Sequence, residues 1–424
     1  MSEISHGNTE LWQPDWVAPL AGYEVVPVSD NKKDELIHRV LESARSKFDY
    51  GHSSQTRNIN GLRVDEWKLN TPDGAELSRL WVVSENAQLR FFVAGLGALS
   101  TLNDDAWRQC IAAGVAKLGN RDSFEWMAII SQRSQIPTIG GGQRLAEAVT
   151  IGDLTFTPFQ SGVADEVLVN MPPVGLHVNS FFHWPLELHG RVSCFDWEKD
   201  GHSLALQRLR RITALLSLSW DADWRLREGP RDPKTKFANS EGPLLGTSWK
   251  KTNPSLPFAG APVEVPTWLP RAEATLNENT KLLHAVLVHQ EGASLCREHS
   301  SMALISFVAA IEAVAQVAKK PERCQECKSV LGSADRFRNA VREVLSEPEA
   351  ELLAAAYGSK RSKTVHQGRL HGLELEYGGW GSMSLFVPDD SFTFSMRTVS
   401  VAQRASRSLL LRVLGVTPQS AYSK

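Results

Sequence analysis

Residues 300–316 read S-S-M-A-L-I-S-F-V-A-A-I-E-A-V-A-Q. Apolar side chains recur there at helical spacing, which predicts a helix with one apolar stripe formed by Leu304, Phe307, Val308, Ile311 and Ala315. Glu312 falls near that stripe. A carboxylate among small apolar neighbours needs a partner, because an unpaired buried charge is costly. The alternative is an ordinary glutamate on the helix surface.

A second segment, residues 357–368, reads Y-G-S-K-R-S-K-T-V-H-Q-G. Arg361 carries a permanent charge that can hold a phosphate through two parallel hydrogen bonds, and His366 can gain or lose a proton near neutral pH. No acidic residue lies between Glu351 and Glu374. Further cationic side chains there are Lys360, Lys363 and Arg369, and His371 can become charged. This composition favours binding of a polyanion such as RNA.

The spacing of Arg361 and His366 limits how the two residues can cooperate. Five residues at about 100° each place them roughly 140° apart on a regular helix, so they would not face one spot. We therefore expect a helix end, a loop or a second subunit at the motif. Gly358 and Ser359 are the predicted interruption, with Ser359 as an N-cap, and a two-fold homodimer would bring two copies of the motif together.

Glu312 followed by R-S-K-T-V-H-Q-G, on an otherwise helical segment, resembles the HEPN domain family and most of all its Apea-like branch. The resemblance covers residues from about 269 to about 414. It implies an all-α bundle with metal-independent endoribonuclease activity, usually in a dimer, and a role in phage defence or toxin systems. By this resemblance Arg361 and His366 are the catalytic pair and Glu312 is the supporting acid. Two features depart from the family: Tyr357 lies one residue further from the arginine, and a glycine-rich stretch at 368–388 precedes the last helix.

The same chemistry follows from the residue types. RNA carries its own nucleophile, the 2′-hydroxyl, so cleavage needs proton transfer and stabilisation of charge on the phosphate. His366 suits the role of general acid or base, Arg361 suits the developing oxyanion, and Glu312 could orient either one. No cofactor is required for this reaction, and Lys360, Lys363 and Arg369 are the expected RNA contacts. The rival hypothesis is a non-catalytic HEPN-type module for nucleotide or RNA binding, or for dimerisation.

Five cysteines, an odd number, do not form a disulfide framework. Cys324 and Cys327 are spaced as C-x2-C, which supplies half of a tetrahedral zinc site. Cys296 and His299 are the nearby residues that could complete a structural zinc site. The alternative is reduced thiols in a polar loop, and a third hypothesis is a zinc or redox regulator built on this pair.

Length and composition set the remaining limits. A chain of 424 residues can form two or three domains, and a formal net charge of −2 indicates that RNA binding would depend on local patches. The sequence has neither an uninterrupted run of 18 apolar residues nor a basic, apolar N-terminal signal, so we expect a cytoplasmic protein without a membrane span.

The order of predicted elements indicates an α+β protein. Residues 1–225 are expected to form an N-terminal α+β domain that senses a ligand or positions substrate, with strands and helices at 33–49, 62–69, 77–83, 89–94, 106–118, 124–130, 154–159, 167–169, 188–196 and 203–217. Residues 226–267, rich in proline, glycine and charge, are the expected linker or mobile loop. Residues 268–424 are the expected helical bundle, with helices at 272–295, 300–318, 333–357 and 392–414. The helix at 203–217 carries Arg208, Arg210 and Arg211, which predict either a nucleic-acid face or a solvated side.

Overall fold

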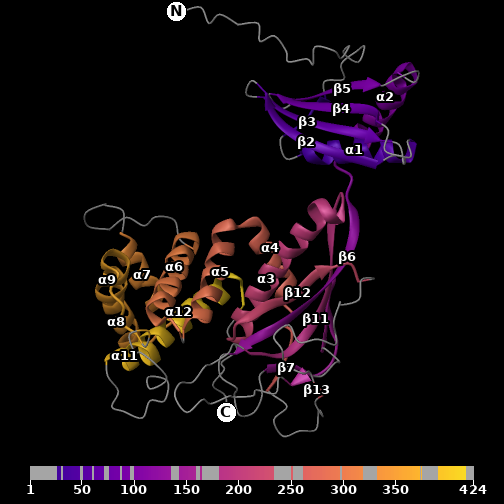
Figure 1. Cartoon of the computed structure of the whole chain (residues 1–424). Coiled ribbons are helices and arrows are strands. Elements are labelled where there is room, and N and C mark those ends of the chain that lie inside the picture. The colour runs from indigo at the N-terminus through magenta and orange to yellow at the C-terminus, as the bar shows by residue number, and fades with distance from the viewer. Residues whose placement is uncertain are drawn as a thin grey trace, which may run out of the picture. The chain divides into compact units, whose positions relative to one another are not determined.

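The computed structural model is an α+β protein whose chain divides into two units, Met1–Asp122 and Ser123–Lys424 (Figure 1). Each unit is described by itself. The structure describes residues 26–29, 32–47, 51–59, 62–70, 76–85, 88–95, 100–134, 143–158, 163–164, 181–233, 250–251, 261–296, 298–318, 332–372, 374 and 390–416. The strand expected at 167–169 lies outside these residues.

Unit 1 is an antiparallel five-stranded sheet that packs against two helices. The sheet order is β1-β5-β4-β3-β2, from β1 (Val26–Pro27), β2 (Gly51–Ile59), β3 (Leu62–Asn70), β4 (Glu76–Glu85) and β5 (Gln88–Gly95). The helices are α1 (Lys33–Lys47) and α2 (Ser100–Lys117). Leu80 and Val82 alternate along β4 toward one face, where they are buried in one cluster with Val40 of α1 and Trp107 of α2. The strands expected at 62–69, 77–83 and 89–94 are confirmed.

Unit 2 begins with a second five-stranded sheet, in the order β12-β6-β11-β9-β8. Its strands are β6 (Asp122–Ser134), β8 (Val149–Ile151), β9 (Leu154–Pro158), β11 (Phe181–Cys194) and β12 (Trp224–Arg231). Helix α3 (His202–Trp220), which follows a π-turn at Trp197–Gly201, packs against β12. Two smaller pairs complete the β-structure: β7 (Gln143–Leu145) with β14 (Ala261–Val263), and β10 (Val163–Ala164) with β13 (Lys250–Lys251).

The rest of unit 2 is helical. The helices are α4 (Leu269–Glu278), α5 (Thr280–Leu295), α6 (Ser300–Ala318), α7 (Ser333–Arg342), α8 (Glu347–Ala356), α9 (Ser362–Gln367), α11 (Asp390–Thr393) and α12 (Ser400–Val413), with π-turns η4 (Tyr357–Arg361) and η6 (Phe394–Val399). The single helix expected at 272–295 is wrong, because Asn279 is extended and its side chain caps α5 by accepting from the Leu282 N–H at 3.0 Å. The helix expected at 333–357 is likewise two helices, since Ser346 and Glu349 form a capping box at the start of α8.

The sheet of unit 2 and its helices share one hydrophobic core. Trp126 of β6, Leu215 of α3, Val286 of α5 and Phe307 of α6 belong to the same buried cluster. The described helices therefore do not pack as a separate domain that begins at residue 268, which is what the sequence predicted. The helices are continuous with a sheet that begins at Asp122.

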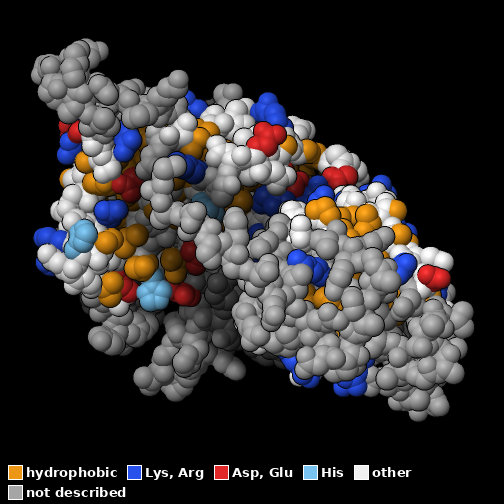
Figure 2. Space-filling model, turned by 90° about the horizontal axis from the view of Figure 1, so that it is seen from above, with side chains coloured by type: hydrophobic (Ala, Val, Ile, Leu, Met, Phe, Trp, Pro, Cys, Tyr) orange, Lys and Arg blue, Asp and Glu red, His pale blue; other side chains and the backbone are white. Residues whose placement is uncertain are grey.

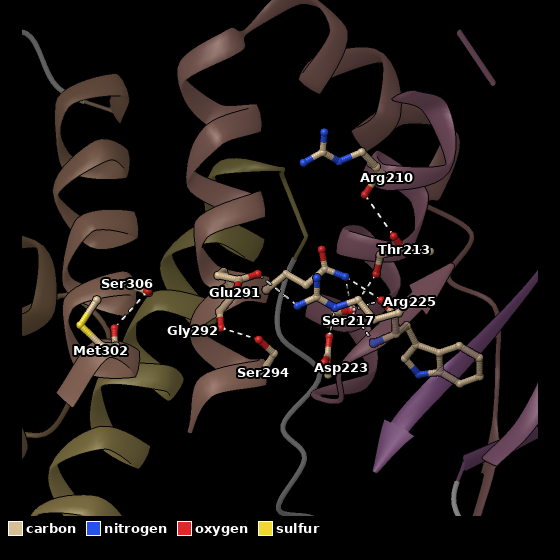
Figure 3. Close-up of polar contacts among 12 residues, drawn as sticks. Arg210, Thr213, Ser217, Asp223, Arg225, Glu291, Gly292, Ser294, Met302 and Ser306 are labelled. Atoms are coloured by element: carbon tan, nitrogen blue, oxygen red, sulfur yellow. Dashed lines mark hydrogen bonds and ion pairs between the residues drawn. The ribbon is translucent and has the colours of Figure 1, made fainter. Parts of the chain in front are cut away.

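Polar contacts connect α5 to the junction of α3 and β12. The Gln290 amide donates to the Trp224 carbonyl at 2.6 Å, and Arg225 lies between Asp223 at 2.7 Å and Glu291 at 3.3 Å (Figure 3). An expected linker at 226–267 begins inside β12, which pairs antiparallel with β6. Proline, glycine and charge are typical of loops but are also tolerated in an edge strand, and β12 lies at the edge of its sheet.

One helix among the described residues is long and apolar enough to cross a membrane, namely α6 over Ser300–Val317. More than half of that window, 56%, is buried inside unit 2. Phe307, Val308 and Ile311 are fully enclosed by neighbouring helices. The burial identifies α6 as the central helix of the unit 2 core.

Candidate active site

Three side chains from two helical segments meet between α6 and the η4 turn. The Tyr357 hydroxyl donates to Glu312 Oε1 at 2.6 Å, and Arg361 Nη2 lies 3.5 Å from Glu312 Oε2. The Arg361 guanidinium also lies over the Tyr357 ring, 5.4 Å from its centroid, which is a cation–π geometry. The side chains of Arg361 and Glu312 are 29% and 19% exposed. Glu312 is therefore a partnered, partly buried carboxylate.

The backbone at the motif is helical throughout, which differs from the expected interruption. Residues Glu347–Gln367 run through α8, the π-turn η4 and α9 without leaving helical geometry. Ser359 is not an N-cap, since its Oγ donates back to the Ala355 carbonyl at 2.7 Å. The irregularity is instead the π-turn, a form often found at functional sites, and Arg361 is its last residue. The helix ends at Gly368, whose φ of 66° is left-handed.

Tyr357 holds a defined position within the site. Its ring stacks on Phe337 of α7 at a centroid distance of 4.5 Å. Burial and the adjacent Glu312 carboxylate raise the pKa of the Tyr357 hydroxyl, which therefore stays a protonated donor at neutral pH. The sequence prediction gave Tyr357 no role. Its spacing of four residues from Arg361 is the signal that could have indicated a contact within one helix.

His366 lies apart from these three residues. It is exposed in the last turn of α9. Within the described part of the chain, no hydrogen bond or ion pair joins it to Glu312, Tyr357 or Arg361. Because α9 is regular from Ser362 onward, the separation of roughly 140° expected from helix geometry applies to Arg361 and His366.

The three expected RNA contacts lie along one stretch of the chain, with Lys360 in η4, Lys363 in α9 and Arg369 just after α9. Lys363 and Arg369 are exposed, and Lys360 is half-buried. None of the three side chains has a hydrogen bond or ion pair to the described residues. Their charges also act on His371, which is buried. Burial is the main reason that the pKa of its imidazole is lowered, and the charges of Lys360, Arg369 and Lys363 lower it further. Basic and histidine side chains are visible beside hydrophobic ones over the helical end of unit 2, at the left of Figure 2.

The cysteine pair expected to bind zinc, Cys324 and Cys327, lies outside the described residues. Cys296 is described, and its Sγ donates to the Gly292 carbonyl at 3.3 Å and approaches Gln403 Oε1 at 3.6 Å. Over the described ranges no group of three or more histidine, cysteine or acidic side chains is arranged to hold a metal ion. The zinc site remains a prediction.

Comparisons with family models, with curated proteins and with solved structures found no match to this chain. The assignment of function rests on the residues and their geometry.

Proposed function

We propose that unit 2 is a metal-independent endoribonuclease of HEPN type that acts in the cytoplasm as a toxin-like or phage-defence factor. The observation that carries this proposal is the contact of Arg361 with Glu312 and Tyr357, two partners from different parts of the sequence. An arginine anchored on one side by a carboxylate and an aromatic ring keeps other donors for a substrate phosphate. Lys360, Lys363 and Arg369, which have no hydrogen bond or ion pair to the described residues, favour an RNA strand.

Each site residue has one task in the proposed reaction. Arg361 stabilises the negative charge that develops on the phosphate as the 2′-hydroxyl attacks. His366 transfers a proton, either from the 2′-hydroxyl or to the leaving 5′-oxygen. Glu312 and Tyr357 orient Arg361, since both contact it or its partner directly. Neither of them needs to touch RNA.

The separation of Arg361 and His366 supports a homodimer as the active form. A two-fold axis near α9 would place the arginine of one protomer beside the histidine of its partner. Exposed apolar side chains on α9, directly after it, on α6 and on η6 could be buried in such an interface; they are Val365, Leu370, Met302 and Met396. The backbone N–H of His371 donates to Ser301 Oγ, and the His371 ring contacts the Phe394 ring. The residues after α9 therefore adjoin the start of α6 and the start of η6.

Mixing two inactive chains tests the shared site. Arg361→Ala and His366→Ala proteins are co-refolded at equal concentration, and RNA cleavage is compared with each variant alone. A site formed across the dimer restores about one quarter of the activity, because half of the randomly formed dimers are mixed and each mixed dimer has one intact site out of two. An active wild-type protein that is monomeric at assay concentration would contradict the dimer.

The products of cleavage test the reaction itself. Purified protein is incubated with RNA in excess EDTA, and the product ends are identified. With the 2′-hydroxyl as nucleophile we expect 2′,3′-cyclic or 3′-phosphate ends, 5′-hydroxyl ends and no cleavage of DNA. Strict dependence on Mg²⁺, or 5′-phosphate ends, would instead show attack by a metal-activated water. Binding of RNA without any cleavage would identify the non-catalytic alternative.

A further inference from the structure

His371 is a buried imidazole that the proposed reaction does not use. It is 8% exposed, and its Nε2 has no hydrogen-bond partner among the described residues. Its backbone N–H donates to Ser301 Oγ at 2.8 Å, and its ring lies 5.8 Å from that of Phe394. Burying a ring nitrogen without a hydrogen-bond partner costs free energy, and such a group is often found at a functional site.

The segment that carries His371 is fixed against the start of α6. Glu374 Oε1 accepts from the N–H groups of Ser301 and Gly372, both at 3.2 Å. A Cβ on Gly372 would lie 2.5 Å from Ser300 Cβ, so the backbone approaches α6 too closely for a side chain. The position of His371 is therefore set by packing and hydrogen bonds. The other carboxylate oxygen, Glu374 Oε2, is buried and also unpartnered within the described residues.

Among the described residues, the charges that act on His371 are unbalanced. Lys360, Lys363 and Arg369 act on it from α9 and the residues that follow, and Glu374 is the carboxylate that acts in the opposite direction. Three cations close to one another repel unless an anion lies among them. Two exposed cations and one half-buried cation that act on a buried imidazole fit the charge and hydrogen-bonding capacity of a phosphate group.

We propose that Lys360, Lys363 and Arg369 form a phosphate-binding subsite whose occupation is coupled to protonation of His371. A bound phosphate offsets the three positive charges and so removes part of what opposes a proton on the imidazole. The proton comes from solvent, and the negative charge of Glu374 favours the imidazolium. By linkage, protonation of His371 strengthens phosphate binding by the same factor.

The occupant follows from the proposed function, on which this part of the inference rests. Lys360 and Lys363 lie on the same helical segment as Arg361 and Arg369 directly follows it, so the subsite would hold a phosphate of the RNA strand next to the one that is cleaved. His371 would then act as a positioning residue: its pairing with Glu374 would tighten the segment after α9 against α6 when RNA is bound. A phosphodiester and a small free anion share the chemistry that this subsite recognises, and experiment can separate them.

The test follows the His371 ring by NMR in a His366→Gln protein, so that the exposed histidine of the motif does not titrate. The pKa of His371 is measured in the free protein, with added sulfate and with an added deoxytetranucleotide. The deoxytetranucleotide cannot be cleaved through a 2′-hydroxyl, and the charge of its phosphodiesters is constant near neutral pH. We expect saturating tetranucleotide to raise that pKa by about one unit, a tenfold change in proton affinity. A response to sulfate without a response to the tetranucleotide would contradict the RNA subsite, and no response to either would overturn the coupling.

Charge removal provides the matched control. In a Lys360→Gln, Lys363→Gln, Arg369→Gln protein, His371 should titrate at higher pH than in the parent, and the tetranucleotide should no longer move it. An unchanged His371 titration in this variant would contradict the subsite. The experiment is independent of cleavage: a tetranucleotide response in a protein that never cuts RNA would support the subsite and reject the nuclease.

Discussion

Unit 2 holds two groups of cationic side chains that differ in how they are paired. On α3, Arg208 is 14% exposed and binds Glu273 at 2.8 Å and Asp153 at 2.5 Å, while Arg211 lies 3.8 Å from Glu273. Around α9, Lys360, Lys363 and Arg369 have no carboxylate partner in the described residues. The two groups are similar in sequence, since each has three cations within ten residues.

The difference shows that cations with similar spacing in the sequence are paired differently in the fold. Arg208 connects α3 to α4 through Glu273 and to the β8–β9 turn through Asp153, so its charge is used within the fold. Neither a nucleic-acid face nor a simple solvated side, the two alternatives for this helix, describes Arg208. Lys360, Lys363 and Arg369 have no such ion pair to the described residues, which is what the proposed binding of an external anion requires.

The largest effect on stability is expected at Arg208. Arg208→Met removes the partner of a buried carboxylate, Glu273, and should lower the free energy of unfolding by about 3 kcal/mol. Chemical denaturation monitored by circular dichroism measures the change. Arg210→Met, two residues further along α3 at an exposed position, should stay within about 0.5 kcal/mol of the parent.

The α9 variant should show the opposite behaviour. Lys360→Gln, Lys363→Gln and Arg369→Gln together should leave the unfolding free energy nearly unchanged, because no ion pair to the described residues is lost. An Arg208 variant as stable as the Arg210 variant, or a strongly destabilised α9 variant, would remove the distinction between the two groups.

A smaller effect is expected in the salt dependence of RNA binding. Each phosphate contact contributes a slope of about −0.7 to log K against log salt for a single strand, so loss of all three α9 cations should make the slope shallower by roughly 2. Fluorescence anisotropy with a short RNA at several salt concentrations measures it. Arg210→Gln should keep the parental slope, and an equal loss in that variant would place the RNA elsewhere.

Sequence patterns predicted the elements with strong periodicity. The central helix at 300–318 and three of the five strands of unit 1, β3, β4 and β5, are at the expected places, whereas β1 and β2 were not predicted. The breaks at Asn279 and Ser346 were missed because apolar spacing continues across them, although both residues are good N-caps. Strand β12 was missed because its pairing with β6, about 100 residues earlier in the chain, compensates for local composition that favours a loop.

The candidate site was predictable only in part. Arg361 and Glu312 could be paired from charge and the family resemblance, and the structure places them in contact. The part played by Tyr357 depends on the π-turn and on Phe337, 20 residues away, which no local pattern encodes. The pairing of Arg208 with Asp153 and Glu273 is likewise a tertiary contact, so the sequence could not separate structural arginines from available ones.

The central claim is that Arg361 acts on an RNA phosphate. Its most direct test is the initial rate of RNA cleavage in EDTA for the parent, Arg361→Ala and the exposed α3 control Arg210→Ala. We expect a loss of at least about 100-fold for Arg361→Ala, as is usual when a donor to a developing oxyanion is removed, with the Arg210→Ala rate unchanged. A folded Arg361→Ala protein that cleaves RNA at the parental rate would contradict it.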